Sequence, residues 1–133
     1  MMTFIAGGIF ERHPALRVQF LEAGCGWVPF WLERMQHVMT GQWSFLEVSL
    51  SLTAREYFHR NCLVAMATDE YDVIPGFLDV LGADNLCWST DFPHPDHDWR
   101  GMRHQFLDRP EISIDDKRKI MGSNAARAYG LKA

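Results

Sequence analysis

The chain has 133 residues, of which 47% are hydrophobic and 23% charged, and its formal net charge is −4 at pH 7. This length predicts a single domain with one core, and this composition excludes an intrinsically disordered chain. The basic residues are scattered along the sequence and form no stripe, so we expect no nucleic-acid partner.

The cysteines and the N-terminal residues predict a reducing compartment. Cys25, Cys62 and Cys87 are widely spaced among apolar neighbours, which predicts buried free thiols and not a disulfide framework. No apolar run reaches the length of about 18 residues that spans a bilayer, and the first residues lack the features of a signal peptide. We therefore expect a cytoplasmic protein with no membrane partner.

The first predicted elements are a helix, a strand and a second helix. Apolar residues at helical spacing predict a helix over residues 1–12 that ends before Pro14, because the residue preceding a proline is disfavoured in the helical region. Alternation predicts a strand over residues 16–21. A helical pattern then covers residues 27–39, with Pro29 in its first turn. Since the chain begins within a helical pattern, we expect its start to be a cut.

The second half continues the alternation. Residues 61–66 form a near-continuous apolar run, which is typical of a strand covered on both faces. A helix follows over residues 71–81, and then a short strand over 86–88. The last predicted helix begins after Ser113, whose spacing to an aspartate resembles a capping box, and ends at Gly130.

This order of elements predicts an α/β fold built from right-handed βαβ units on a parallel sheet. Residues 41–60 give no clear pattern. With only three predicted strands the sheet would have two exposed apolar edges, which soluble proteins avoid. The sheet is therefore expected to be completed by a second copy, or the chain to be a piece of a larger fold.

Ligands of parallel α/β folds lie beyond the carboxyl ends of the strands. Three segments meet this condition, residues 22–26, 68–70 and 89–98. In the third, Asp91 directly follows an apolar strand, where a carboxylate could bind a metal or accept a proton from water. The alternative is a structural aspartate that caps the following loop.

Other candidates lie in the same segments. Glu22 ends an apolar strand and is either functional or paired with a basic neighbour. The run His94-Pro95-Asp96-His97-Asp98 contains potential metal ligands, although its spacing matches no known pattern and a solvated loop is the alternative.

The turn Gly24-Cys25-Gly26 allows three interpretations. It resembles part of a phosphate-binding turn but lacks the third glycine, so a tight turn without a ligand explains it better. Cys25 could be a nucleophile, although no neighbouring residue supplies a base.

Four segments together resemble a known family. They are Gly-Gly-Ile-Phe-Glu-Arg-His-Pro at 7–14, Glu-x-Gly-x-Gly-Trp-x-Pro at 22–29, Thr-Asp-Phe-Pro-His at 90–94 and Ser-Asn-Ala-Ala-Arg at 123–127. In this order they are similar to the C-terminal part of the amidohydrolase-related family. That family comprises metal-dependent barrel hydrolases and decarboxylases, including aminocarboxymuconate-semialdehyde decarboxylase.

The resemblance implies a fold and an activity. The family fold is a (β/α)8 barrel, so residues 1–133 would supply about strands six to eight with their helices, and the N-terminal part of the barrel would be missing. The chain would belong to a metal-dependent hydrolase or nonoxidative decarboxylase. Its substrate would be a small carboxylated or cyclic molecule.

The resemblance also implies roles for particular residues. Asp91 stands where the family has a catalytic ligand of a divalent metal, usually zinc. The other family ligands, a His-x-His pair and a histidine of a middle strand, are absent from this sequence. Because a catalytic zinc ordinarily needs about three protein ligands, we expect the chain alone to be inactive and to bind no metal.

Four further residues would contact substrate. Glu22 stands where some members have a histidine, and Trp27 and His94 would line the pocket. Arg34 lies near the position of an arginine that, in the decarboxylases, reaches the substrate of a neighbouring subunit, which implies a homo-oligomer.

Two other interpretations remain open. The chain could be a non-catalytic, truncated or split module that persists by self-association through its sheet edges. It could also be an independent flavodoxin-like domain, which would need a self-contained sheet of five strands.

Overall fold

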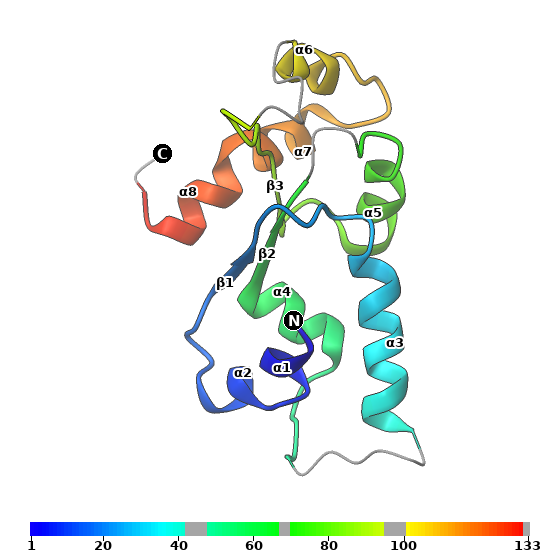
Figure 1. Ribbon diagram of the computed structural model, residues 1–133, viewed down its shortest axis with the longest axis vertical. Helices are drawn as coiled ribbons and strands as arrows, with labels where there is room; N and C mark the ends of the chain where they lie inside the picture. Colours follow the sequence, from blue (N-terminus) through cyan, green and yellow to red (C-terminus); the bar gives the residue numbers. More distant parts are fainter. Residues whose placement is uncertain (42–47, 67–69, 95–100, 132–133) are drawn as a thin grey trace.

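The computed structural model describes residues 1–41, 48–66, 70–94 and 101–131. In this part of the chain three parallel strands form one sheet in the order β1-β2-β3 (Figure 1). In the view of Figure 1, α3 and α5 stand to one side of the strands and α8 to the other. The predicted α/β class and parallel sheet are confirmed, and the described residues show no five-stranded sheet.

The strands are short and are separated by helices. The strands are β1 (Val18–Phe20), β2 (Cys62–Ala65) and β3 (Leu86–Cys87). The helices are α1 (Met2–Ile5), α2 (Ile9–Arg12), α3 (Val28–Thr40), α4 (Ala54–Asn61), α5 (Ile74–Leu81), α6 (Met102–Leu107), α7 (Ile114–Arg118), the π-helical turn η1 (Lys119–Ser123) and α8 (Asn124–Tyr129). Across the described ranges we find no helix with both the length and the apolar character to cross a bilayer.

Two helices were not predicted. α4 carries a local start signal, because the Thr53 hydroxyl accepts a hydrogen bond from the backbone N–H of Glu56 and the Glu56 carboxylate accepts one from that of Thr53. Its buried positions are Ala54, Tyr57, Phe58 and Asn61, a helical spacing that a small and a polar residue obscure. α6 begins at a left-handed glycine, Gly101.

The core lies between the sheet and the helices. β2 is buried along its whole length, as its apolar run predicts, and Cys62, Val64 and Met66 face the main cluster. The large side chains of this cluster come from several helices and include Phe10, Tyr57, Phe58, Phe77 and Phe106, all at most 1% exposed. Cys25, Cys62 and Cys87 are buried free thiols, which confirms that prediction.

Three buried asparagines connect the amino ends of the strands. Asn61, just before β2, donates through Nδ2 to the carbonyls of Pro14 and Leu16, ahead of β1. Asn85, just before β3, donates to the carbonyls of Phe58, His59 and Cys62 around the start of β2. Asn124, at the start of α8, donates to the carbonyls of Ala83 and Leu86. Each amide therefore ties its own segment to the strand that comes before it in the sequence: Asn61 to β1, Asn85 to β2 and Asn124 to β3.

At the carboxyl ends, Glu70 holds the turn that follows β1. Its carboxylate accepts the backbone N–H groups of Cys25 at 2.6 Å and Gly26 at 3.1 Å. Gly24 makes this approach possible, because its φ is +63° and a Cβ there would lie 2.2 Å from Glu70 Oε1. A residue 45 positions away in sequence thus fixes the backbone next to Glu22.

Replacing Asn85 with leucine should lower the free energy of unfolding, because the carbonyls of His59 and Cys62 lose their side-chain donor and each loss costs about 1–3 kcal/mol. Gln105→Leu is the matched control, since Gln105 is exposed on α6 and its removal should change stability by less than about 0.5 kcal/mol. Urea denaturation of both variants measures the difference. Equal stabilities would contradict the role given to Asn85.

Gly24→Ala should destabilise the protein by about 2 kcal/mol or more, because the left-handed backbone costs about 1–2 kcal/mol with a side chain and the new methyl group meets Glu70. The same substitution at Gly76, within α5, has nothing within 4 Å and should stabilise the helix by about 0.5–1 kcal/mol. Thermal unfolding should therefore move in opposite directions for the two variants. An unchanged or raised melting temperature of the Gly24 variant would contradict the close packing of this turn against Glu70.

Candidate metal centre

Asp91 and His94 form a compact turn beyond β3. The backbone N–H of His94 donates to the Asp91 carbonyl at 2.9 Å, and the His94 Nδ1 lies 2.9 Å from Asp91 Oδ1. The hydroxyls of Ser89 and Thr90 accept the backbone N–H groups of Asp91 and Phe92. The Asp91 side chain is 20% exposed and that of His94 56% exposed, so the pair is reachable from solvent.

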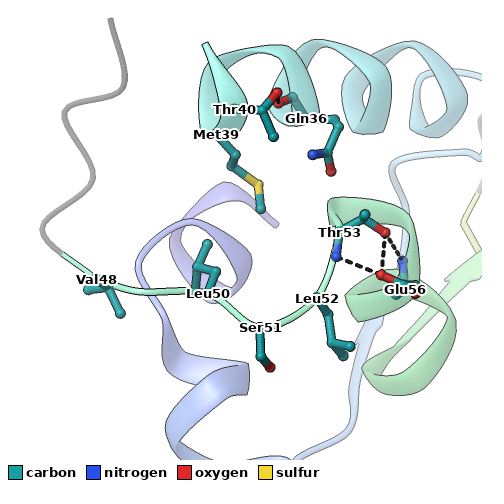
Figure 2. A pocket seen from close by; sticks show the side chains of 9 residues that line it. All are labelled: Gln36, Met39, Thr40, Val48, Leu50, Ser51, Leu52, Thr53 and Glu56. Atoms are coloured by element: carbon teal, nitrogen blue, oxygen red, sulfur yellow. Dashed lines mark hydrogen bonds between the residues drawn. The ribbon is translucent and has the colours of Figure 1, made fainter. Parts of the chain in front are cut away.

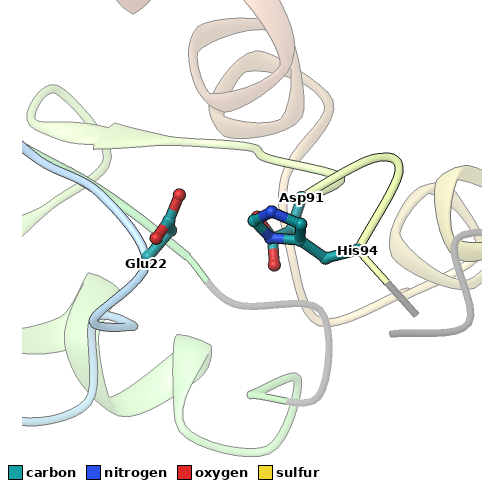
Figure 3. Close-up of side chains that lie close together, drawn as sticks. All are labelled: Glu22, Asp91 and His94. Atoms are coloured by element: carbon teal, nitrogen blue, oxygen red, sulfur yellow. The ribbon is translucent and has the colours of Figure 1, made fainter. Parts of the chain in front are cut away.

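Glu22 approaches this turn from the end of β1. Potential ligand atoms of Glu22, Asp91 and His94 all lie within 4.8 Å of one another (Figure 3). Because β1 and β3 are parallel strands on either side of β2, their carboxyl ends emerge at the same edge of the sheet. The structure therefore brings together three of the five residues that the sequence nominates.

The backbone is unusual at both carboxylates. Glu22 has a φ of 58° and Asp91 a φ of 53°, and they are the two non-glycine residues with positive φ in the described chain. A left-handed conformation costs a side-chain-bearing residue about 1–2 kcal/mol. Such conformations persist where the surrounding structure enforces them, and they gather at functional sites. Here they occur at the two residues that follow the outer strands.

The donor set suits a divalent cation. Two carboxylates and one imidazole are ligands that manganese and zinc both accept, and three protein ligands with an open position is the usual arrangement of a catalytic zinc. The sequence analysis gave the metal role to Asp91 alone and substrate roles to Glu22 and His94, and the structure places the side chains of all three close enough to share one ion.

Trp27 and Arg34 lie outside this group. The Trp27 indole donates to the Gly24 carbonyl at 3.0 Å, and its ring meets Phe20 edge-on, so the side chain supports the turn after β1. Arg34 lies on the exposed face of α3, where with Phe30, Glu33 and His37 it lines a shallow cavity of about 280 Å³.

The turn Gly24-Cys25-Gly26 binds an anion, but that anion is the carboxylate of Glu70. Its amides are therefore already occupied, which argues against a phosphate site. The Cys25 side chain is 0% exposed, and burial, with the nearby Glu70 carboxylate, raises the pKa of its thiol. A neutral buried thiol is a poor nucleophile, so the nucleophile interpretation of Cys25 is not supported.

Glu70 is the residue that the sequence did not single out. It lay within the predicted segment 68–70, but only its contacts reveal its role. The remaining candidates Pro95, Asp96, His97 and Asp98, and the first two residues of segment 68–70, lie outside the described residues.

A separate cavity of about 400 Å³ lies between α3 and the segment that precedes α4 (Figure 2). Its polar lining is engaged within the protein, since Gln36 Oε1 accepts the backbone N–H of Ala54 and Glu56 caps Thr53. None of the sequence-nominated residues lines it.

The chain is similar in sequence and in fold to several known decarboxylases. The chain is 27% identical over 130 residues to 2-amino-3-carboxymuconate-6-semialdehyde decarboxylase of Dictyostelium discoideum, covering 97% of this chain and 35% of that protein. Its fold is similar to that of 5-carboxyvanillate decarboxylase from Sphingomonas paucimobilis, with a TM-score of 0.78 and 28% identity over 97% of this chain and 38% of the other.

A further solved structure adds a likeness in fold. The 5-carboxyvanillate decarboxylase of Novosphingobium aromaticivorans, which is complexed with manganese and 4-hydroxy-3-methoxy-5-nitrobenzoic acid, matches with a TM-score of 0.74 and 22% identity over 96% of this chain and 37% of that one. The chain thus spans little more than a third of the length of these relatives. The model of the family described as Amidohydrolase matches residues 1–131, nearly the whole sequence, and the chain belongs to that family.

Proposed function

We propose that this chain supplies the C-terminal part of the barrel, about strands six to eight, of a metal-dependent decarboxylase that acts on a small carboxylated substrate. The single observation that carries the proposal is the convergence of Glu22, Asp91 and His94 at the carboxyl edge of a parallel sheet. This is the edge at which barrel enzymes of this architecture place their chemistry.

The chain's own residues have separate tasks in this proposal. Asp91 is the central ligand, and Glu22 and His94 complete the part of the site that this chain contributes. Glu70 and Trp27 hold the turn after β1, so that Glu22 keeps its left-handed conformation. When bound, a divalent cation supplies a Lewis acid that polarises an oxygen of the substrate. We expect zinc or manganese, since the ligands suit both.

Decarboxylation is favoured over hydrolysis by the relatives. The protein of Dictyostelium discoideum and that of Sphingomonas paucimobilis are both named as decarboxylases. The substrate class follows from the second, whose name denotes a carboxylated aromatic ring. Arg34 keeps its proposed role toward the substrate of a neighbouring subunit, because it is exposed on α3 and free to face another copy.

Metal binding gives the first test. The 133-residue chain should bind Mn²⁺ and Zn²⁺ in a 1:1 complex, and Asp91→Asn should weaken the affinity by more than about 100-fold, since even partners outside the ligand set commonly contribute 10–100-fold. Asp79→Asn removes the same charge from the exposed face of α5 and should leave the affinity unchanged. Isothermal titration measures both. If the Asp91 variant bound metal as tightly as the wild type, the proposed metal centre would be contradicted.

Activity gives the second test. The chain should not release CO₂ from 5-carboxyvanillate on its own, even with Mn²⁺, because the ligands and pocket walls of the missing barrel strands are needed. Joined to the residues encoded in frame upstream of Met1, it should do so. Turnover by the chain alone would contradict the proposal of a partial barrel.

A non-catalytic self-associating module is a second candidate, favoured by the sheet edges. In the described residues β1 and β3 each pair with β2 alone, and Leu21 after β1 is 55% exposed. Such edges invite pairing with another chain. Analytical ultracentrifugation should then show a dimer or larger assembly without metal, whereas a stable monomer would rule this candidate out.

A further inference from the structure

Another polar cavity lies at the amino ends of the strands, on the side of the sheet opposite to Glu22, Asp91 and His94. It has a volume of about 240 Å³ and is formed where the strands begin. Arg17 precedes β1, His59 and Arg60 end α4, Asn85 precedes β3, and Arg127 lies on α8. The cavity thus gathers residues from four separate parts of the chain.

Positive charge is concentrated in this cavity. Three guanidinium groups line it, those of Arg17, Arg60 and Arg127, and none of its lining residues is acidic. The neighbouring Asp84 carboxylate contacts Lys119, with Nζ 2.8 Å from its Oδ1, and the pKa of this carboxyl is lowered mainly by that contact and to a smaller extent by Arg127. A cationic cavity in a chain of net charge −4 is not explained by the general composition.

The guanidinium groups are held by neutral acceptors. Arg17 Nη1 donates to the carbonyls of Pro14 and Leu16, and Arg127 Nη2 donates to that of Asp84. Half-buried Arg60 donates to the Phe10 carbonyl at 2.7 Å. Arg60 also donates through Nε to Asn61 Oδ1 at 2.9 Å and lies over the Tyr57 ring. The direct hydrogen-bond acceptors of the three groups are thus neutral, while the carboxylates of Asp84 and Glu11 act on Arg127 and Arg60 from farther away. Since a guanidinium has five N–H donors, each retains donors for a ligand.

Asn85 determines which nitrogen of His59 carries a proton. The Asn85 Nδ2 donates to three carbonyls, so its Oδ1 must be the atom that lies 2.9 Å from His59 Nδ1. Nδ1 can therefore donate to this oxygen, and in that tautomer Nε2 is an acceptor, so the guanidinium groups and not His59 would bind the oxygens of an anion. The imidazole is thus held in one orientation by an amide that is itself buried.

We propose that this cavity binds a small phosphate-type oxyanion, as the free ion or as the head group of a small phosphate ester. Fork-shaped guanidinium groups match the oxygens of such an anion in pairs. The volume is below the range of about 300–1,000 Å³ typical of pockets for larger ligands, which limits the ligand to a small one. The site is separate from the proposed metal centre and does not depend on it.

Titration of the 133-residue chain with inorganic phosphate and with glycerol 3-phosphate, each at constant ionic strength, tests the proposal. Saturable 1:1 binding of either compound is expected. Arg17→Gln and Arg127→Gln should each weaken it by about ten- to a hundredfold, the loss of one charge-assisted hydrogen bond. Arg17→Lys, which keeps the charge, should retain part of the affinity.

Arg55→Gln is the matched control, because Arg55 is exposed on α4, donates to one backbone carbonyl and does not line the cavity. It should bind like the wild type, and circular dichroism should show every variant folded. Heats that rise linearly without saturation, or an equal loss in the Arg55 variant, would overturn the site and leave only a general effect of charge.

Discussion

Buried asparagine amides fasten the amino ends of the three strands to one another. Asn124 reaches the start of β3, Asn85 the start of β2 and Asn61 the approach to β1, so the sheet is secured in sequence from the last helix to the first strand. The strands themselves have only two to four residues and make few ladder hydrogen bonds. The asparagine amides therefore add contacts between neighbouring strands that the short backbone pairing does not provide.

The asparagine contacts lie at the amino ends of the strands, and the candidate metal ligands lie at the carboxyl ends. At the carboxyl ends, Glu70 holds the turn after β1, close to Glu22, and the hydroxyls of Ser89 and Thr90 hold the turn at Asp91. Glu22 and Asp91 both have left-handed backbones there. The two edges therefore have different polar chemistry. Amides and guanidinium groups lie where the strands begin, and carboxylates with one imidazole lie where they end.

The sequence predicts what depends on neighbours along the chain. Alternation located β1 and apolar runs located β2 and β3, and the position of Asp91 after the third run predicted its place beyond the strand end. Contacts between distant residues could not be read in this way, since Glu70 lies 45 residues from Cys25, and Asn124 lies 41 residues from Ala83. α4 was not predicted for a related reason. Asn61, on its buried face, donates to the Pro14 carbonyl ahead of β1, and this polar residue interrupts the apolar pattern.

The central claim is that Glu22, Asp91 and His94 form the part of a metal centre that this chain contributes. Crystals of the protein grown with Mn²⁺ test it directly through anomalous scattering. The account predicts a peak within bonding distance of a carboxylate oxygen of Glu22 and of Asp91 and of a nitrogen of His94. A difference map without a peak there, in crystals where these three side chains are ordered, would contradict it.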